Sequence, residues 1–376
     1  MFFKPLNITY SNKHLPVLDG LRGFAVFIVI LYHLFPYLKG FSFGWMGVNL
    51  FFVLSGFLIT GILLNTKDSP NYYTNYLARR ILRIFPLYYL FLILFFVGFS
   101  LTVIPSLIPD YAYLHNHQLW YWLYIQNWLP LFDTDYPSLN ILSHFWSLAI
   151  EEQFYIFWPF IVYITPRKNM LFVCVSLILF SITCRLIFYT DEALFSRVYT
   201  FTLTRLDGLA IGSALAVMIR DPYYINLLNR YTLKLALVLA ALLAITVAIS
   251  KSLSFYNPLL GTYGYTLIDL FFGCILVTTL SHTPSNIVKS AAEMKWLTFL
   301  GKYSYGIYVY HVPLYRLLAD SLNGITNSNL LTSLLCLLLL IGLAYLSYHL
   351  VEKPFLKLKS RFSHTPVPVS VPVKND

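Results

Sequence analysis

Residues 21–33 read LRGFAVFIVILYH, an apolar run with a cation near one end and a histidine at the other. Arg22 and His33 are eleven residues apart. On an α-helix this is about three turns plus 20°, so both side chains point the same way, about 16 Å apart along the axis. Ionisable groups inside a bilayer usually face the bundle interior, at a substrate path or catalytic site. Either residue alone fits a structural role, but the aligned pair favours a functional one.

The composition is that of a polytopic membrane protein. Of 376 residues, 58% are hydrophobic and 11% are charged, whereas soluble proteins carry about 25% charge. The first apolar run is too long for a cleavable signal peptide and contains Asp19 and Arg22. The net charge of +10 is interpreted through loop placement and not as a nucleic-acid footprint. The cysteines all lie inside apolar runs, where they are expected to pack and not to bind metal or form disulfides: Cys174, Cys184, Cys274 and Cys336.

Ten apolar runs are long enough to cross a membrane, which predicts an all-α bundle of about ten transmembrane helices. They cover 17–38, 44–65, 83–104, 144–165, 169–189, 203–219, 232–250, 262–281, 297–318 and 329–351. The aromatic stretch Leu119–Leu131 is interrupted, and we interpret it as an interfacial segment of a long outer loop.

Basic residues alternate between loops, which predicts that both termini are cytoplasmic. The loop at about 105–143 contains no Lys or Arg and carries Asp110, Asp133 and Asp135. We expect residues 1–360 to form one integral-membrane domain and residues 361–376 to be a disordered cytoplasmic tail. The basic residues assigned to the cytoplasmic side are Lys67, Arg79, Arg80, Arg83, Arg167, Lys168, Arg220, Arg230, Lys234, Lys289, Lys295, Lys353, Lys357, Lys359 and Arg361.

This topology places several polar residues in the outer half of the bundle. His33 is near the outer end of the first span, and Glu151 and Glu152 are expected about 10–12 Å below the outer surface, at similar depth. A buried chamber with a histidine and carboxylates is suited to acid–base chemistry, although transporters build similar relays. Other residues expected near this chamber are Asn49, Ser55, Trp146, Asp207, Asp269 and His311.

Residues 79–88 read RRILRIFPLY and carry a second signal on the cytoplasmic side. Arg80 and Arg83 are one helical turn apart and are able to bind the same anion, since guanidinium groups suit phosphates. Either these arginines are positive-inside anchors, or they bind a phosphate-rich donor such as a nucleotide thioester. No phosphate loop, dinucleotide fingerprint or metal-binding spacing accompanies them.

Together these motifs resemble the bacterial membrane acyltransferase 3 family, and the resemblance extends over nearly the whole chain. The residues that carry it are LDGLRG at 18–23, the Arg22-to-His33 spacing, FFVLSGFLIT at 51–60, Arg79–Arg83 with Pro86, SLAIEEQFY at 147–155, RLDG at 205–208 and GKYSYGIY at 301–308.

The resemblance implies a ten-helix enzyme of the cell membrane that moves an acyl group, commonly acetyl, from a cytoplasmic thioester to a carbohydrate hydroxyl. His33 matches the family's essential histidine, and Arg22, Arg80 and Arg83 match its essential arginines. Some members carry a fused extracytoplasmic hydrolase-like domain. This chain is therefore expected either to finish the transfer itself or to hand the acyl group to a separate extracytoplasmic partner.

The implied chemistry gives each residue a role. His33 is expected to remove the proton of a hydroxyl on a cell-surface or lipid-linked carbohydrate, or to carry the acyl group, with Glu152 or Glu151 orienting its imidazole. Acyl-CoA, most simply acetyl-CoA, is the expected co-substrate, and no permanently bound cofactor or metal is expected. Arg80 and Arg83 would hold its phosphates, and Arg22 with Asp19 would line the path inward.

Two assignments and two functions stay open at this stage. Ser55 is either a hydrogen-bond donor in the chamber or a helix-packing residue, and Trp146 either stacks on a sugar or belongs to an interfacial belt. A proton-coupled transporter would use His33 and Glu152 as a relay, and inverted repeats, which the sequence lacks, would favour it. An acyl flippase serving a partner enzyme is the third alternative.

Overall fold

The computed structural model describes residues 15–102, 104–188, 198–255, 257–280 and 286–362. Every regular secondary-structure element within these ranges is helical, so the predicted all-α class is confirmed. Most of the predicted disordered tail, residues 363–376, lies outside the described residues.

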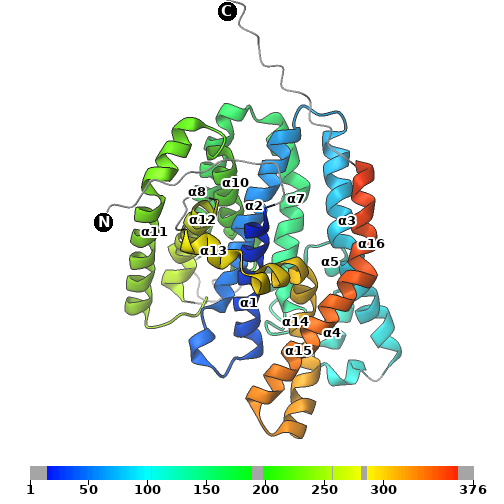
Figure 1. Ribbon diagram of the computed structural model, residues 1–376. Helices are drawn as coiled ribbons and strands as arrows, with labels where there is room; N and C mark the ends of the chain where they lie inside the picture. The colour runs from blue at the N-terminus through cyan, green and yellow to red at the C-terminus, as the bar shows by residue number, and fades with distance from the viewer. Residues whose placement is uncertain (1–14, 103, 189–197, 256, 281–285, 363–376) are drawn as a thin grey trace, which may run out of the picture.

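Each of the ten predicted spans overlaps a long helix in Figure 1. These helices are α1 (Pro16–Leu34), α2 (Gly47–Thr66), α3 (Tyr72–Ile93), α7 (Trp146–Ile164), α8 (Met170–Phe188), α10 (Leu206–Met218), α11 (Pro222–Ser250), α12 (Tyr265–Thr279), α14 (Lys295–Thr326) and α15 (Asn329–Ser347). Short helices complete the described fold: α4 (Tyr111–Asn116), α5 (Gln118–Trp122), α6 (Leu129–Phe132), α13 (Ile287–Ala292) and α16 (Lys353–Lys357).

Seven helical stretches in the described part of the chain are long and apolar enough to cross a membrane. The protein is therefore a multi-pass membrane protein, as predicted. The other three predicted spans correspond to α7, α10 and α14; α10 has only 13 residues. Ten crossings and cytoplasmic termini thus stay predictions.

Basic residues of three connections donate to backbone carbonyl oxygens near one end of the bundle, the upper end in Figure 1: Lys67, Arg167 and Arg220. Lys67 donates to the carbonyl oxygens of Val162 (2.8 Å) and Thr165 (2.5 Å), near the end of α7. Arg220 donates to the carbonyl oxygen of Gly61 in α2 (2.9 Å). Cations suit the last turn of a helix because its free carbonyls carry partial negative charge. These residues therefore stabilise the helix ends that they contact.

Glycines bring α1 and α14 into backbone contact. A Cβ added at Gly23 would lie 1.9 Å from the carbonyl oxygen of Leu297, and one at Gly301 would lie 1.8 Å from that of Asp19. Small residues allow this close approach between membrane helices. Because Arg22 lies beside Gly23, the crossing holds its side chain next to α14.

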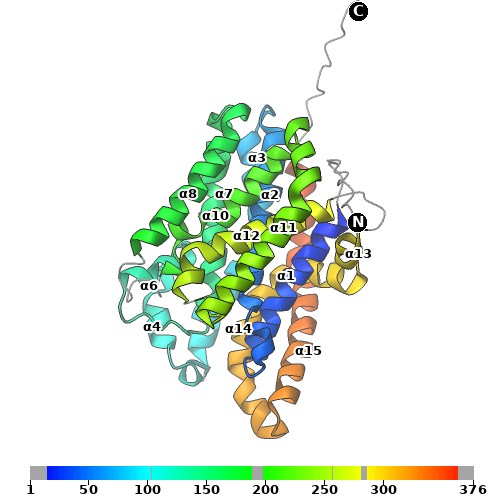
Figure 2. The ribbon, with the colours of Figure 1, turned by 90° about the vertical axis from the view of Figure 1, so that its left-hand side faces the viewer.

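The outer connection contains only short helices, α4, α5 and α6, which confirms that Leu119–Leu131 is not a further spanning helix. The Tyr113 hydroxyl donates to Asp133 (2.5 Å). Burial and this carboxylate raise the pKa of Tyr113, so the phenol keeps its proton. Figure 2 shows α4 and α6 of this segment below α8, at the lower left.

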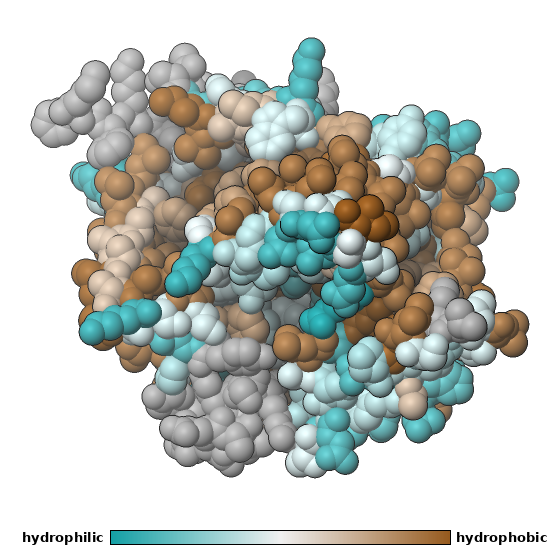
Figure 3. All heavy atoms as spheres, turned by 90° about the horizontal axis from the view of Figure 1, so that it is seen from below, coloured by the Kyte–Doolittle hydropathy of each residue, from teal (hydrophilic) through white to brown (hydrophobic). Residues whose placement is uncertain are grey.

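Hydropathy differs across the end of the bundle at which α1 terminates. Figure 3 shows hydrophilic side chains across the middle of this face, bordered by hydrophobic ones. This distribution suits a water-facing end whose flanks contact lipid.

Candidate functional site

A cavity lined by three arginines lies between α1, α2, α3, α7 and α14. With its opening it holds about 570 Å³ of empty space. Arg22 of α1 joins Arg80 and Arg83 of α3 in its lining, although their sequence motifs are far apart. Buried Nε atoms of Arg22 and Arg80 have no hydrogen-bond partner. Clustered guanidinium groups with unused donors suit an anion with several oxygens.

The predicted carboxylates line this same cavity. Ser55 donates to Glu151 Oε1 (2.5 Å) and accepts from the Tyr155 hydroxyl (3.0 Å). Ser55 therefore orients Glu151 and is not merely a helix-packing residue. Glu152 is 5% exposed and also lines the cavity. Asp19 is not among the lining residues of this cavity.

The C-terminal helical turn places a lysine near the arginines. Lys359, in the 3₁₀ segment Leu358–Phe362, interacts electrostatically with Arg83, Arg80 and Arg22. Arg79 donates to the carbonyl oxygen of Phe362 (3.1 Å), which fixes this segment on α3. The sequence assigned Lys359 and Arg79 to topology alone.

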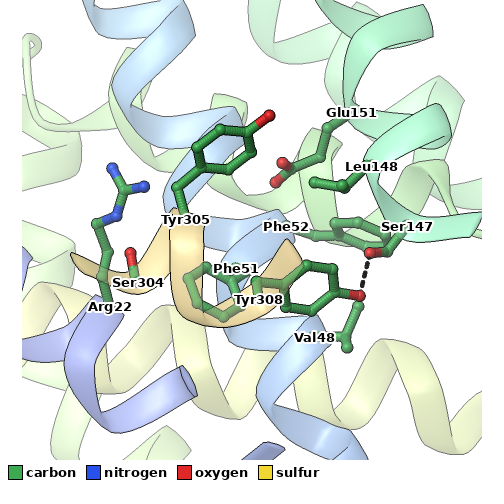
Figure 4. A pocket seen from close by; sticks show the side chains of 10 residues that line it. All are labelled: Arg22, Val48, Phe51, Phe52, Ser147, Leu148, Glu151, Ser304, Tyr305 and Tyr308. Carbon is green, nitrogen blue, oxygen red and sulfur yellow. Dashed lines mark hydrogen bonds between the residues drawn. The ribbon is translucent and has the colours of Figure 1, made fainter. Parts of the chain in front are cut away.

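A second, mainly apolar cavity adjoins the first and shares Arg22, Glu151 and Tyr305 with it. In Figure 4 the Tyr305 ring lies between Arg22 and Glu151. Its hydroxyl donates to the carbonyl oxygen of Ile84 (2.7 Å), so α14 is tied to α3. The remaining lining residues are mostly apolar: Val48, Phe51, Phe52, Ser147, Leu148, Ser304 and Tyr308.

The far part of this apolar cavity carries a hydroxyl pair. The hydroxyl oxygens of Ser147 and Tyr308 are 2.5 Å apart, and a dashed line marks this contact in Figure 4. The Tyr308 hydroxyl donates to the carbonyl oxygen of His144 (2.9 Å). Since a phenol has one hydrogen, Ser147 is the donor in the pair.

Three histidines lie next to Tyr308. The His311 ring is 5.2 Å from that of Tyr308 and 4.8 Å from each of the His33 and His144 rings. They come from α14, α1 and the 3₁₀ segment Ser143–Phe145. The structure thus places His311 and His144 in one group with His33.

The expected pairing of His33 with Glu151 or Glu152 is not formed. Neither carboxylate has a hydrogen bond or ion pair with His33 among the described residues, and the polar partner of His33 is the carbonyl oxygen of Val29 (2.9 Å). α1 ends at Leu34 and not near residue 38. His33 therefore lies in the last turn, where His144 is the residue from the fourth span that reaches the cluster.

Three other predicted chamber residues form a separate, internally paired cluster. Asp207 makes an ion pair with Arg185 (2.9 Å) and accepts from Thr266 (2.6 Å). Asn49 donates to Asp269 (2.8 Å). All five side chains are buried, and none of them lines the two cavities described above. The predicted single chamber is therefore divided.

Trp146 belongs to this second cluster. It lies 5.8 Å from the guanidinium of Arg205, which is also surrounded by Phe52 (5.8 Å), Tyr199 (5.1 Å) and Tyr265 (4.3 Å). With 8% exposure, Trp146 has no free face for a sugar ring. Its aromatic face is used for a cation–π contact instead.

Sequence reasoning missed His144, Tyr305, Tyr308 and Ser147. One signal was available: Tyr305, Tyr308 and His311 recur every three residues on a predicted span, so they share one helix face. His144 carried no such signal, because it precedes its helix.

The model of a protein family described as "Acyltransferase domain" matches residues 15–349. Peptidoglycan O-acetyltransferase OatA of Listeria monocytogenes is 32% identical over 363 residues, which cover 93% of this chain and 57% of that protein. The putative peptidoglycan O-acetyltransferase YrhL of Bacillus subtilis is 36% identical over 368 residues, or 92% of this chain and 55% of the relative.

O-acetyltransferase OatA of Staphylococcus aureus is 32% identical over 328 residues, covering 83% of this chain and 52% of that protein. The chain thus spans about half the length of these curated relatives. No solved structure matches it.

Proposed function

Because this chain belongs to the acyltransferase family whose model covers residues 15–349, we propose that it transfers acetyl from cytoplasmic acetyl-CoA to a hydroxyl of a cell-wall glycan. The names of its relatives support peptidoglycan or a lipid-linked precursor as the acceptor. One observation carries the proposal: an arginine-lined cavity adjoins an apolar one, whose lining residue Tyr308 packs against His311 of the histidine cluster.

The arginine cavity supports a donor with several phosphates. Coenzyme A carries a pyrophosphate and a further phosphate, and the cavity offers Arg22, Arg80 and Arg83 with Lys359 nearby. Guanidinium forks bind phosphate oxygens in pairs. The first proposed step is therefore binding of the donor's phosphates at the arginine cavity.

The apolar cavity supports passage of the thioester arm. Arg22 and His33 lie on the same helix, α1, about 16 Å apart at helical rise. The flexible arm of coenzyme A would reach along the cavity while its phosphates stay on the arginines. Its thioester would then arrive near Tyr308 and the histidines.

His33 is oriented to act as a base or as an acyl carrier. Its Nδ1 lies 2.9 Å from the carbonyl oxygen of Val29, which only accepts, so Nδ1 carries the hydrogen and Nε2 has the free lone pair. In direct transfer, Nε2 takes the hydroxyl proton as the oxygen attacks the thioester carbonyl, and the thiolate leaves. In the covalent route, Nε2 attacks the carbonyl first.

Sealed vesicles of both orientations, containing the purified protein, test this function. Labelled acetyl-CoA is supplied to the arginine-cavity face, and a membrane-impermeant peptidoglycan fragment is supplied to the other face. We expect labelled O-acetyl ester on the glycan only in this arrangement. Product that forms only when both substrates share the cytoplasmic face would contradict transfer through the membrane. Labelled acetate or acetyl-histidine without glycan product would favour a handover to a partner.

Removing one arginine of the cavity should weaken donor binding selectively. Arg80→Ala or Arg83→Ala is expected to cost about 1.5–3 kcal/mol per lost charge-assisted contact, which is about 10–100-fold in the Kd of acetyl-CoA. Arg→Lys should recover only part of it, because the bidentate fork is lost. Calorimetric titration of acetyl-CoA into the protein in nanodiscs measures this.

Arg230→Ala is the matched control, because that guanidinium stacks on Tyr231 of α11, outside the cavity. If Arg80→Ala and Arg83→Ala bind acetyl-CoA as tightly as wild type but insert with altered orientation, these arginines serve only to set the topology.

A further inference from the structure

The histidine cluster is built from buried groups in a part of the bundle that apolar side chains would otherwise fill. His144 is 4% exposed and His311 is 1% exposed. Polar side chains in such surroundings are costly unless their hydrogen bonds are satisfied. The contacts of the two nitrogens of each ring therefore decide what the cluster can bind.

One nitrogen of every ring is bonded to a backbone carbonyl. The pairs are His33 Nδ1 with Val29 (2.9 Å), His311 Nδ1 with Tyr308 (2.7 Å), and His144 Nε2 with Val309 (3.2 Å). Because a carbonyl oxygen only accepts, these three nitrogens carry the hydrogens of neutral imidazoles.

The opposite nitrogens are consequently lone pairs. His311 Nε2 and His144 Nδ1 are buried and have no hydrogen-bond partner, and His33 Nε2 has none among the described residues. The cluster thus holds three acceptors without a donor. Within the described chain, no group of three His, Cys, Asp or Glu side chains is arranged to hold a metal ion. A proton, a substrate hydroxyl or a water would supply the missing donor.

We propose that the three histidines form one proton-accepting unit, in which His33 takes the proton of the acceptor hydroxyl and His311 shares it. His311 and His144 are then positioning residues. At Nδ1 of His33 the carbonyl oxygen of Val29 takes the place that a carboxylate has in a Ser–His–Asp triad, so neither Glu151 nor Glu152 is needed there. This inference rests on the proposed function.

The step balances without a further reactant. The acceptor oxygen forms a bond to the thioester carbonyl carbon, and the carbon–sulfur bond breaks. The hydroxyl proton moves to Nε2 of His33, is shared with Nε2 of His311, and passes to the departing thiolate. The products are an O-acyl ester and a free thiol, and all three imidazoles are neutral again.

Two substitutions remove the lone pairs while keeping the backbone hydrogen bonds. In His311→Asn the amide nitrogen replaces Nδ1 at the carbonyl of Tyr308, and in His144→Gln it replaces Nε2 at that of Val309. We expect kcat to fall about 10²-fold in His311→Asn, the lower end of the range of acid–base contributions, and about 10-fold, below that range, in His144→Gln. The KM for acetyl-CoA should be unchanged, and added imidazole should partly restore His311→Ala.

His349→Asn is the control, since that ring packs on Tyr345 and is not part of the cluster. If wild type transfers acetyl while His311→Asn keeps more than half of kcat, the proton-sharing unit is refuted and the proposed function stands. Loss of donor affinity together with kcat, without imidazole rescue, would show a merely structural role.

If the wild-type protein transfers no acetyl, the proposed function fails. Nitrogen-15 NMR of labelled histidines in nanodiscs then still tests the proton-sharing unit by itself. We expect Nδ1–H tautomers for His33 and His311 and an Nε2–H tautomer for His144. We also expect His311→Asn to change the His33 signals. Opposite tautomers, or His33 signals that ignore His311, would overturn the shared unit.

Discussion

Replacement of His33 by Ala is expected to lower acetyl transfer by about 10²–10⁴-fold, the range of a lost general base, while expression and membrane insertion stay near normal. The physical reason is that Nε2 of His33 is the free lone pair beside the far part of the donor path, with Nδ1 held by Val29. Labelled acetyl-CoA and a glycan acceptor measure the rate, and size-exclusion chromatography in detergent checks the fold.

His349→Ala is the matched control for this experiment, because it removes a histidine that packs on Tyr345 of α15 and on Tyr348. It should keep the wild-type rate. A well-folded His33→Ala protein that retains more than one-tenth of that rate would remove His33 from the chemistry and transfer the question to His311.

The second large effect is expected at the crossing of α1 and α14. Gly301→Leu should prevent most of the protein from reaching its folded state, because its Cβ would lie 1.8 Å from the backbone oxygen of Asp19. Extra methylenes in a packed core cost about 1–3 kcal/mol when side chains can move. Here the obstacle is backbone, so the helices must separate. The yield of monodisperse protein and its Tm in detergent measure the loss.

Gly324→Leu tests the same substitution in the same helix, at a position with nothing within 4 Å of an added Cβ. It should leave yield and Tm near wild type. Equal behaviour of the two variants would show that the close contact of α1 and α14 does not stabilise the protein.

The fold class was predictable because hydrophobic length dominates this chain. Each apolar run had to be buried in lipid or in the bundle, and the predicted ranges therefore overlap helices throughout. Helix ends were less predictable. The run 17–38 stays apolar beyond Leu34, yet α1 ends there, since the chain turns into two short 3₁₀ segments before α2.

The candidate site was predicted only in part. Arg22, Arg80, Arg83 and His33 were identified, and the structure brings the arginines together. Which groups face one another depends on the rotation and crossing of whole helices. Contacts at Gly23 and Gly301 set these, and no single-sequence pattern reports them. Hence His144, and not a glutamate, meets the histidines of α1 and α14.

Because α1 and α14 cross in close contact, these two helices also fix a distance within the protein. Arg22 and His33 lie on one rigid helix, and Tyr305 and His311 lie on the other, so the length between phosphate site and histidines cannot vary independently. With the proposed donor, the distance between the phosphate site and the histidines sets the position of the thioester carbonyl, whatever acyl chain follows it. Discrimination between acetyl and longer acyl groups is then set by the space around His311 and His144, beyond the carbonyl, and not by the arginines that hold the donor.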